Sequence, residues 1–117
     1  MTEEKRPVRI LVVEDDRSSK TVISAALLSK YEVTTAGDGI EALRIIKAGQ
    51  IPDLVVTDMM MPGLDGFEMV RRLRKFEKTS QLPVIMLTAK ADTQSFQQGR
   101  DIGVNDYLTK PLTSDRL

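Results

Sequence analysis

Short apolar runs alternate along the chain with longer segments in which apolar residues recur at every third or fourth position. A continuous apolar run is typical of a strand buried on both faces of a parallel sheet, whereas helical spacing is typical of a helix with one buried face. We therefore predict strands at residues 8–13, 33–36, 54–57, 84–87 and 106–108.

The segments between these runs carry helix signals. Asp38 is a suitable N-cap for the second of them, and Gly49 suits a left-handed C-terminal position. We predict helices from Asp16 or Ser18 to about Lys30, from 38 to 49, from 66 to 75 and across 96–102. In the first two helices the shared apolar faces are Val22, Ile23, Ala26 and Leu27, and then Ile40, Leu43 and Ile46.

Alternating strands and helices joined by short connections predict one α/β domain with a parallel sheet and right-handed crossovers. Ligands of such sheets bind outside the carboxyl ends of the strands, at the point where the strand order reverses. The residues at these predicted ends are Glu14, Asp15, Asp16, Asp58, Thr88 and Lys110.

The composition excludes several kinds of site chemistry. The chain has 117 residues, a length that suits one domain, with 17 basic and 17 acidic residues and a formal net charge of zero. Without Cys or His it has no disulfide, thiol nucleophile or imidazole base. Zero net charge argues against a protein whose main task is to bind nucleic acid. Apolar runs of strand length and a polar start predict a cytoplasmic protein without membrane contact.

Carboxylates are the main candidates for site chemistry. If Glu14, Asp15 and Asp58 converge to about 5 Å, each like-charged pair costs about 3 kcal/mol at an effective dielectric constant near 20. A hard divalent cation would offset this repulsion, and an all-oxygen site favours Mg²⁺, with Mn²⁺ as the alternative. The ammonium of Lys110 and the hydroxyl of Thr88 could each bind a phosphate oxygen.

These groups suit phosphoryl transfer to a carboxylate. Asp58 is the candidate nucleophile, and it needs no base because a carboxylate is already ionised. The cation and Lys110 would neutralise the developing negative charge. The backbone carbonyl of Met60, just past the nucleophile, is a further candidate metal ligand, because its thioether is too soft for Mg²⁺.

The order of these motifs resembles the response-regulator receiver domain of two-component signalling, the phosphoacceptor module to which chemotaxis regulators belong. The residues that carry the resemblance are Glu14-Asp15, Asp58–Gly66, Thr88-Ala89 and Lys110-Pro111. The resemblance covers nearly the whole chain. It implies a flavodoxin-like, doubly wound, five-stranded parallel sheet in the order 2-1-3-4-5.

The resemblance also implies a role for each site residue. Asp58 would accept phosphate from the phosphohistidine of a histidine kinase or phosphotransfer protein. Asp15 would bind Mg²⁺ directly, Glu14 through water and Met60 by its carbonyl. Lys110 would bind the phosphate and precede a cis peptide bond to Pro111.

Two further pairs of positions follow from the resemblance. Thr88 and Tyr107 would form a switch in which Thr88 is drawn to the phosphoryl group and Tyr107 turns inward behind it. Met60 and Lys90 would flank the path of hydrolytic water and tune the lifetime of the phosphate. The only enzymology implied is self-phosphorylation from phosphodonors and autodephosphorylation.

Other interpretations remain open for the whole chain and for single residues. The chain could be a pseudo-receiver that only scaffolds contacts. An aspartyl-phosphate phosphatase is less favoured, because that chemistry needs an acid where Met60 stands. Asp16 is as good a helix cap as a ligand. Alone, Tyr107 would be an ordinary strand aromatic, and the basic run at residues 71–75 fits a solvated helix face better than nucleic-acid contact.

Receiver domains end with a fifth amphipathic helix, of which residues 113–117 supply only a cap and a first turn. We therefore expect residues 1–117 to be a receiver domain truncated before or within that helix. Its apolar sheet face would then associate with a partner or weaken the isolated fragment. The expected partners are the kinase or phosphotransfer protein, which would dock beside the first helix, an output domain or effector, and a second copy in a homodimer.

Overall fold

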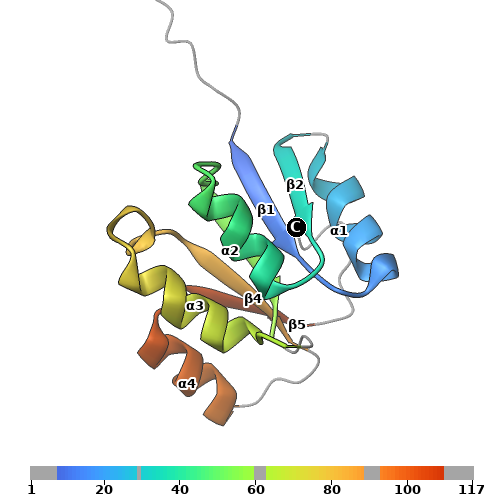
Figure 1. Ribbon diagram of the computed structural model, residues 1–117. Coiled ribbons are helices and arrows are strands. Elements are labelled where there is room, and N and C mark those ends of the chain that lie inside the picture. Colours follow the sequence, from blue (N-terminus) through green and yellow to red (C-terminus); the bar gives the residue numbers. More distant parts are fainter. Residues whose placement is uncertain (1–7, 29, 60–62, 89–92, 110–117) are drawn as a thin grey trace, which may run out of the picture.

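The computed structural model describes residues 8–28, 30–59, 63–88 and 93–109. Strands and helices alternate as the sequence predicts, with strand boundaries shifted by one residue at most (Figure 1). A 3-10 turn, which the sequence did not predict, follows the third helix. The elements are β1 (Arg9–Val13), α1 (Arg17–Leu28), β2 (Glu32–Ala36), α2 (Gly39–Lys47), β3 (Leu54–Asp58), α3 (Gly66–Lys75), η1 (Glu77–Thr79), β4 (Val84–Thr88), α4 (Thr93–Ile102) and β5 (Asp106–Thr109).

The strands form one parallel sheet in the order β2-β1-β3-β4-β5, which confirms the expected topology. The chain runs from β1 outward to β2 and then crosses back to β3 on the other side of β1. The order therefore reverses between β1 and β3, where Val13 pairs with Thr57. This switch point is where a sheet of this type opens a crevice at the carboxyl ends of its strands.

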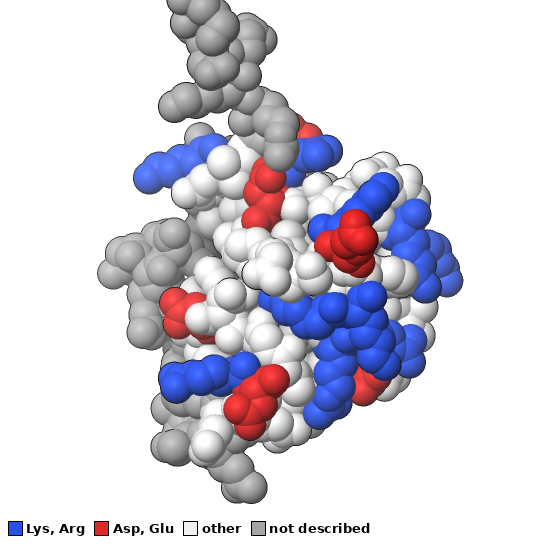
Figure 2. Space-filling model, turned by 90° about the vertical axis from the view of Figure 1, so that its left-hand side faces the viewer, with Lys and Arg blue, Asp and Glu red and all other residues white. Residues whose placement is uncertain are grey.

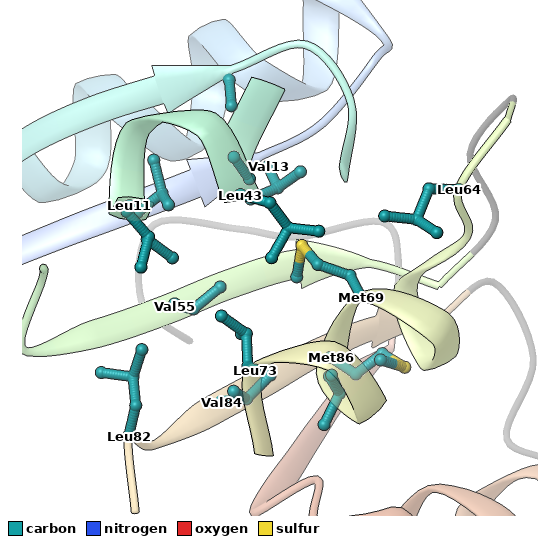
Figure 3. Packing of buried hydrophobic residues seen from close by; sticks show 14 of the residues in the cluster. Leu11, Val13, Leu43, Val55, Leu64, Met69, Leu73, Leu82, Val84 and Met86 are labelled. Atoms are coloured by element: carbon teal, nitrogen blue, oxygen red, sulfur yellow. The ribbon is translucent and has the colours of Figure 1, made fainter. Parts of the chain in front are cut away.

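Alternating strand side chains build a core on each face of the sheet. On one face α2 and α3 pack on β1, β3 and β4, with α4 beside α3. Figure 3 shows Leu43 of α2 and Met69 and Leu73 of α3 directed toward strand residues such as Val55 and Val84. On the opposite face, Ile23 and Leu27 of α1 pack on strand residues Ile10, Val12, Val56 and Leu87.

The helix ends follow the local chemistry of the sequence. Asp38 caps α2 by accepting the N–H of Glu41 over 2.8 Å, and Gly49 follows this helix with a φ of 100°. Asp65 caps α3 in the same way through the N–H of Glu68, at 2.9 Å. Among the described residues, no helix is long and apolar enough to span a membrane.

Two apolar residues do not lie where the sequence pattern put them. Val22 and Ile40 were expected on buried helix faces, but 48% and 52% of their surfaces are exposed. The buried stripes centre on Ile23 and Leu27 in α1 and on Leu43 and Ile46 in α2. At about 100° per residue, Val22 lies about 120° and Ile40 about 90° from the centre of its stripe, beyond the contact with the sheet.

Candidate functional site

Three carboxylates meet at the switch point. Glu14 and Asp15 directly follow β1, and Asp58 is the last residue of β3. Because Val13 pairs with Thr57, the residues that come next on the two strands stand side by side. One oxygen from each of Glu14, Asp15 and Asp58 lies within 4.8 Å of the others. The structure therefore brings together the three carboxylates that the sequence placed at the strand ends.

The three side chains differ in their access to solvent. Glu14 is fully buried and 9% of the surface of Asp58 is exposed, whereas Asp15 is exposed to solvent. A cation would stabilise three carboxylates this close, two of which are largely out of water. The set offers only hard oxygen ligands, so it fits Mg²⁺ or Mn²⁺ and not a metal that prefers sulfur or nitrogen.

Backbone hydrogen bonds hold the ends of both strands in place. The Glu14 N–H donates to the carbonyl of Ala36 over 3.0 Å, and one oxygen of its carboxylate accepts the Asp16 N–H at 3.3 Å. The Met59 N–H donates to the carbonyl of Leu87 at 3.0 Å. The site is thus built on the rigid edge of the sheet, which suits a preorganised binding site.

Asp16 does not belong to the carboxylate cluster. It is exposed, it directly precedes α1, and its backbone carbonyl accepts the N–H of Lys20 at 2.9 Å. This placement favours the start of the helix over a metal ligand as its role.

The neighbouring strand brings Thr88 to the same edge. Asp58 pairs with Leu87, so Thr88 lies one residue further along β4 than the level of Asp58. Only 1% of its surface is exposed. A hydroxyl in this position is close to the carboxyl edge without being open to bulk water.

Tyr107 lies on the last strand, paired with Met86 of β4. Its ring is half-buried against the core between the sheet, α2 and α3. Burial raises the pKa of its hydroxyl, while the charge of Arg100 and a hydrogen bond with the backbone of Gly99 oppose that rise. Tyr107 is therefore packed against α4 and does not project freely into solvent.

Several predicted positions lie outside the described residues. They are Met60, Lys90, Lys110 and the Lys110-Pro111 bond, and their roles stay predictions.

The basic run at residues 71–75 contains two kinds of side chain. Arg71 and Arg72 are exposed and pair with Glu68 at 3.2 and 3.5 Å, as expected of a solvated helix face. Figure 2 shows Lys and Arg gathered on one side of the molecule with acidic residues beside them. Arg74 differs, because it is half-buried and donates to the carbonyls of Thr79 and Gly103 at 2.9 and 2.6 Å. Sequence reasoning missed this structural role.

Known proteins are similar to this chain in both sequence and fold. The family model of the response regulator receiver domain matches residues 10–117. The response regulator MprA of Mycobacterium sp. strain KMS is 45% identical over 112 residues, covering 95% of this chain and 47% of that protein. The chain thus spans about half the length of this relative.

Solved structures resemble the fold closely. The chemotaxis protein CheY4 of Vibrio cholerae superposes with a TM-score of 0.89 at 32% identity, covering 94% of this chain and 92% of that one. The receiver domain of the sensor histidine kinase PA1611 of Pseudomonas aeruginosa gives 0.84 at 38% identity, covering 95% and 91%. That structure has a magnesium ion coordinated in its active-site cleft.

Proposed function

The chain belongs to the response regulator receiver domain family, the phosphoacceptor switches of two-component signalling, and we propose that Asp58 is its phosphoacceptor. The observation that carries this proposal is the convergence of Glu14, Asp15 and Asp58 within 4.8 Å at the switch point of the sheet. Asp58 is the member of this set that ends a central strand and retains some exposure.

The proposed reaction is transfer of a phosphoryl group from the phosphohistidine of a kinase or phosphotransfer protein. A carboxylate oxygen of Asp58 attacks phosphorus as the P–N bond breaks, and the departing imidazole nitrogen keeps the bonding electron pair. The product is an acyl phosphate on Asp58, and the donor histidine leaves as neutral imidazole because its phosphorylated ring carries a proton on the other nitrogen. The ionised carboxylate requires no base.

A divalent cation at this site would supply positive charge for the phosphoryl oxygens. Asp15 and Asp58 would bind Mg²⁺ directly, and Glu14 would act through water. The carboxylates fit this role because they are close together, include two of low exposure and offer only oxygen ligands. The carbonyl of Met60 would complete the protein ligands.

We assign the remaining roles on the same basis. Lys110 would neutralise a phosphoryl oxygen and Thr88 would donate to another, which makes the position of Thr88 depend on phosphorylation. Tyr107 would follow Thr88 as the second member of the switch. Met60 and Lys90 would set the rate at which water removes the phosphate, so the chain's own enzymology would be limited to gaining and losing that group.

The partners proposed are a histidine kinase or phosphotransfer protein and an output domain or effector. A match that covers less than half of MprA supports an output region elsewhere in the full protein. We also propose that a fifth helix packs on the sheet beside α1. The sheet face beside α1 carries a largely apolar groove of about 380 Å³, lined by residues such as Ile10, Tyr31, Val56, Ile85 and Leu108, which such a helix would cover.

Intact mass measured after incubation with Mg²⁺ and acetyl phosphate tests the acceptor. The wild type should gain one phosphoryl group, whereas Asp58→Asn and a Mg²⁺-free sample should gain none. Asp53→Asn is the matched control, because Asp53 precedes the same strand but lies at its opposite end. If a folded wild type gains no mass, the chain is a pseudo-receiver that scaffolds contacts without phosphorylation.

A further inference from the structure

Gly99 faces the hydroxyl of Tyr107 across the gap between α4 and β5. A Cβ atom built on Gly99 would overlap that hydroxyl and would lie 2.8 Å from Cζ of the same ring. It would also lie 3.1 Å from Cε1 of Phe67 on α3. The tip of the Tyr107 ring thus occupies the space in which any other residue at position 99 would place its side chain.

The backbone conformation at position 99 does not itself require glycine. Gly99 lies inside α4, and its φ is not among the positive values, which occur at Gly49, Gly63 and Gly103. Glycine in the interior of a helix makes the helix less stable than alanine does. The reason for glycine at this position is therefore the space it leaves and not the conformation it permits.

The neighbouring groups hold the ring in this space. Tyr107 packs on the core that includes Met59 and Met86, and its hydroxyl hydrogen-bonds the Gly99 backbone. Figure 1 shows α4 beside α3, with β5 at the adjacent edge of the sheet. The ring is consequently bounded by α3, α4 and the sheet.

We propose that Gly99 is a positioning residue that forms the seat of Tyr107, so that the side chain at position 99 decides whether the ring can stay inward. The seat itself is a matter of packing and does not depend on phosphorylation. Its consequence for signalling rests on the proposed function, in which Tyr107 moves together with Thr88. A larger residue at position 99 would then bias the domain toward the state in which Tyr107 points outward.

A double-mutant cycle separates the seat from a general effect on the helix. Gly99→Ala should lower the thermal midpoint when Tyr107 is present, because the methyl group and the ring compete for one space. In a Tyr107→Ala background the same change should raise the midpoint, since alanine favours the helix and the space is free. Equal shifts in the two backgrounds would overturn the proposal.

Fluorescence gives a second measurement, which a general effect of alanine on helix stability would not change. The chain has two Tyr and no Trp, so Tyr31→Phe leaves Tyr107 as its only strong emitter. In that background Gly99→Ala should increase quenching by acrylamide, because the ring is driven into solvent. Gln98→Ala, an exposed change on the same helix, should leave quenching as it was. If Gly99→Ala leaves quenching unchanged, the seat does not exist.

Phosphorylation of the same variants distinguishes the seat from the proposed function. If the seat is coupled to the acceptor, Gly99→Ala should change the rate of phosphorylation by acetyl phosphate, and Gln98→Ala should not. A rate that stays constant while quenching rises would overturn the coupling and leave the seat in place. If Asp58 takes no phosphate in any variant, the proposed function fails, and the quenching result still decides the seat.

Discussion

The backbone N–H of Gly66, the first residue of α3, donates to the carbonyl of Met59 over 3.0 Å. This bond draws the start of α3 onto the end of β3. A Cβ atom on Gly66 would overlap the carbonyl oxygen of Asp58 and lie 3.1 Å from Cα of Met59. The end of β3 and the start of α3 therefore approach each other more closely than any residue other than glycine at position 66 allows.

Gly66→Ala should destabilise the protein and displace Asp58. Alanine is normally favoured over glycine in a helix by up to about 1 kcal/mol, but backbone overlap of this kind costs about 1–3 kcal/mol and cannot be relieved by a rotamer change. We expect urea unfolding to show a net loss and phosphorylation by acetyl phosphate to slow. Gly37→Ala is the matched control, because its Cβ would meet only a carboxylate oxygen of Glu41, at 3.5 Å. A Gly66→Ala variant as stable as this control would contradict the prediction.

Removal of one carboxylate should have opposite effects with and without metal. Without Mg²⁺, Asp15→Asn relieves like-charge repulsion and should raise the free energy of unfolding by about 1 kcal/mol, since Asp15 is exposed. With Mg²⁺ at a hundred times its dissociation constant, the wild type should gain about 2.7 kcal/mol, and Asp15→Asn should gain much less.

Thermal unfolding with and without Mg²⁺ measures both effects. Asp16→Asn is the control, because Asp16 is adjacent in sequence but lies outside the carboxylate cluster. A Mg²⁺-dependent gain that Asp15→Asn retains in full would remove Asp15 from the metal site.

Arg74 should contribute to stability in a way that Arg72 does not. Arg74 ties α3 to Thr79 and to the loop before β5, where it also donates to Oδ1 of Asn105 at 3.2 Å, and burial lowers its pKa. Arg74→Met should lower the free energy of unfolding by about 1–3 kcal/mol, because carbonyl oxygens lose charged donors. Arg72→Met removes only an exposed ion pair and should cost under about 1 kcal/mol. Urea denaturation measures both variants. Equal losses in the free energy of unfolding would contradict this role of Arg74.

The strands and the carboxylate cluster could be predicted from the sequence for a physical reason. Strands buried on both faces of a parallel sheet appear as continuous apolar runs, and the chain order of such runs places their carboxyl ends at one edge. Glu14, Asp15 and Asp58 therefore meet where expected. Spacing alone did not give the strand order 2-1-3-4-5, which came from the resemblance to receiver domains.

Contacts between distant elements could not be predicted in this way. Hydrophobic spacing assigned Ile40 to a buried face, although the direction from which the sheet approaches α2 leaves it exposed. Gly66 and Gly99 gave no signal, because the atoms that exclude a side chain come from Asp58 in one case and Tyr107 in the other. Asp65 is a suitable helix N-cap, but a cap does not reveal the close approach of α3 to β3.

The ionisation of Tyr107 should make stability depend on pH in the alkaline range. Burial raises the pKa of this hydroxyl in the folded protein, whereas the unfolded chain titrates near the usual value of about 10. Between these two pKa values the folded state holds more protons than the unfolded state. Stability from this group is therefore fully present below about pH 10 and is lost as the pH rises through the folded pKa.

Urea unfolding of the wild type and Tyr107→Phe across this range measures the contribution. The wild type should lose stability more steeply with rising pH than Tyr107→Phe, because phenylalanine has no proton to release. Tyr31→Phe, which keeps Tyr107, should retain the steeper loss. Gly99→Ala should behave more like Tyr107→Phe, since a ring driven into solvent loses the burial that raises its pKa. Parallel curves for the wild type and Tyr107→Phe would show that the ring is not held in a buried position.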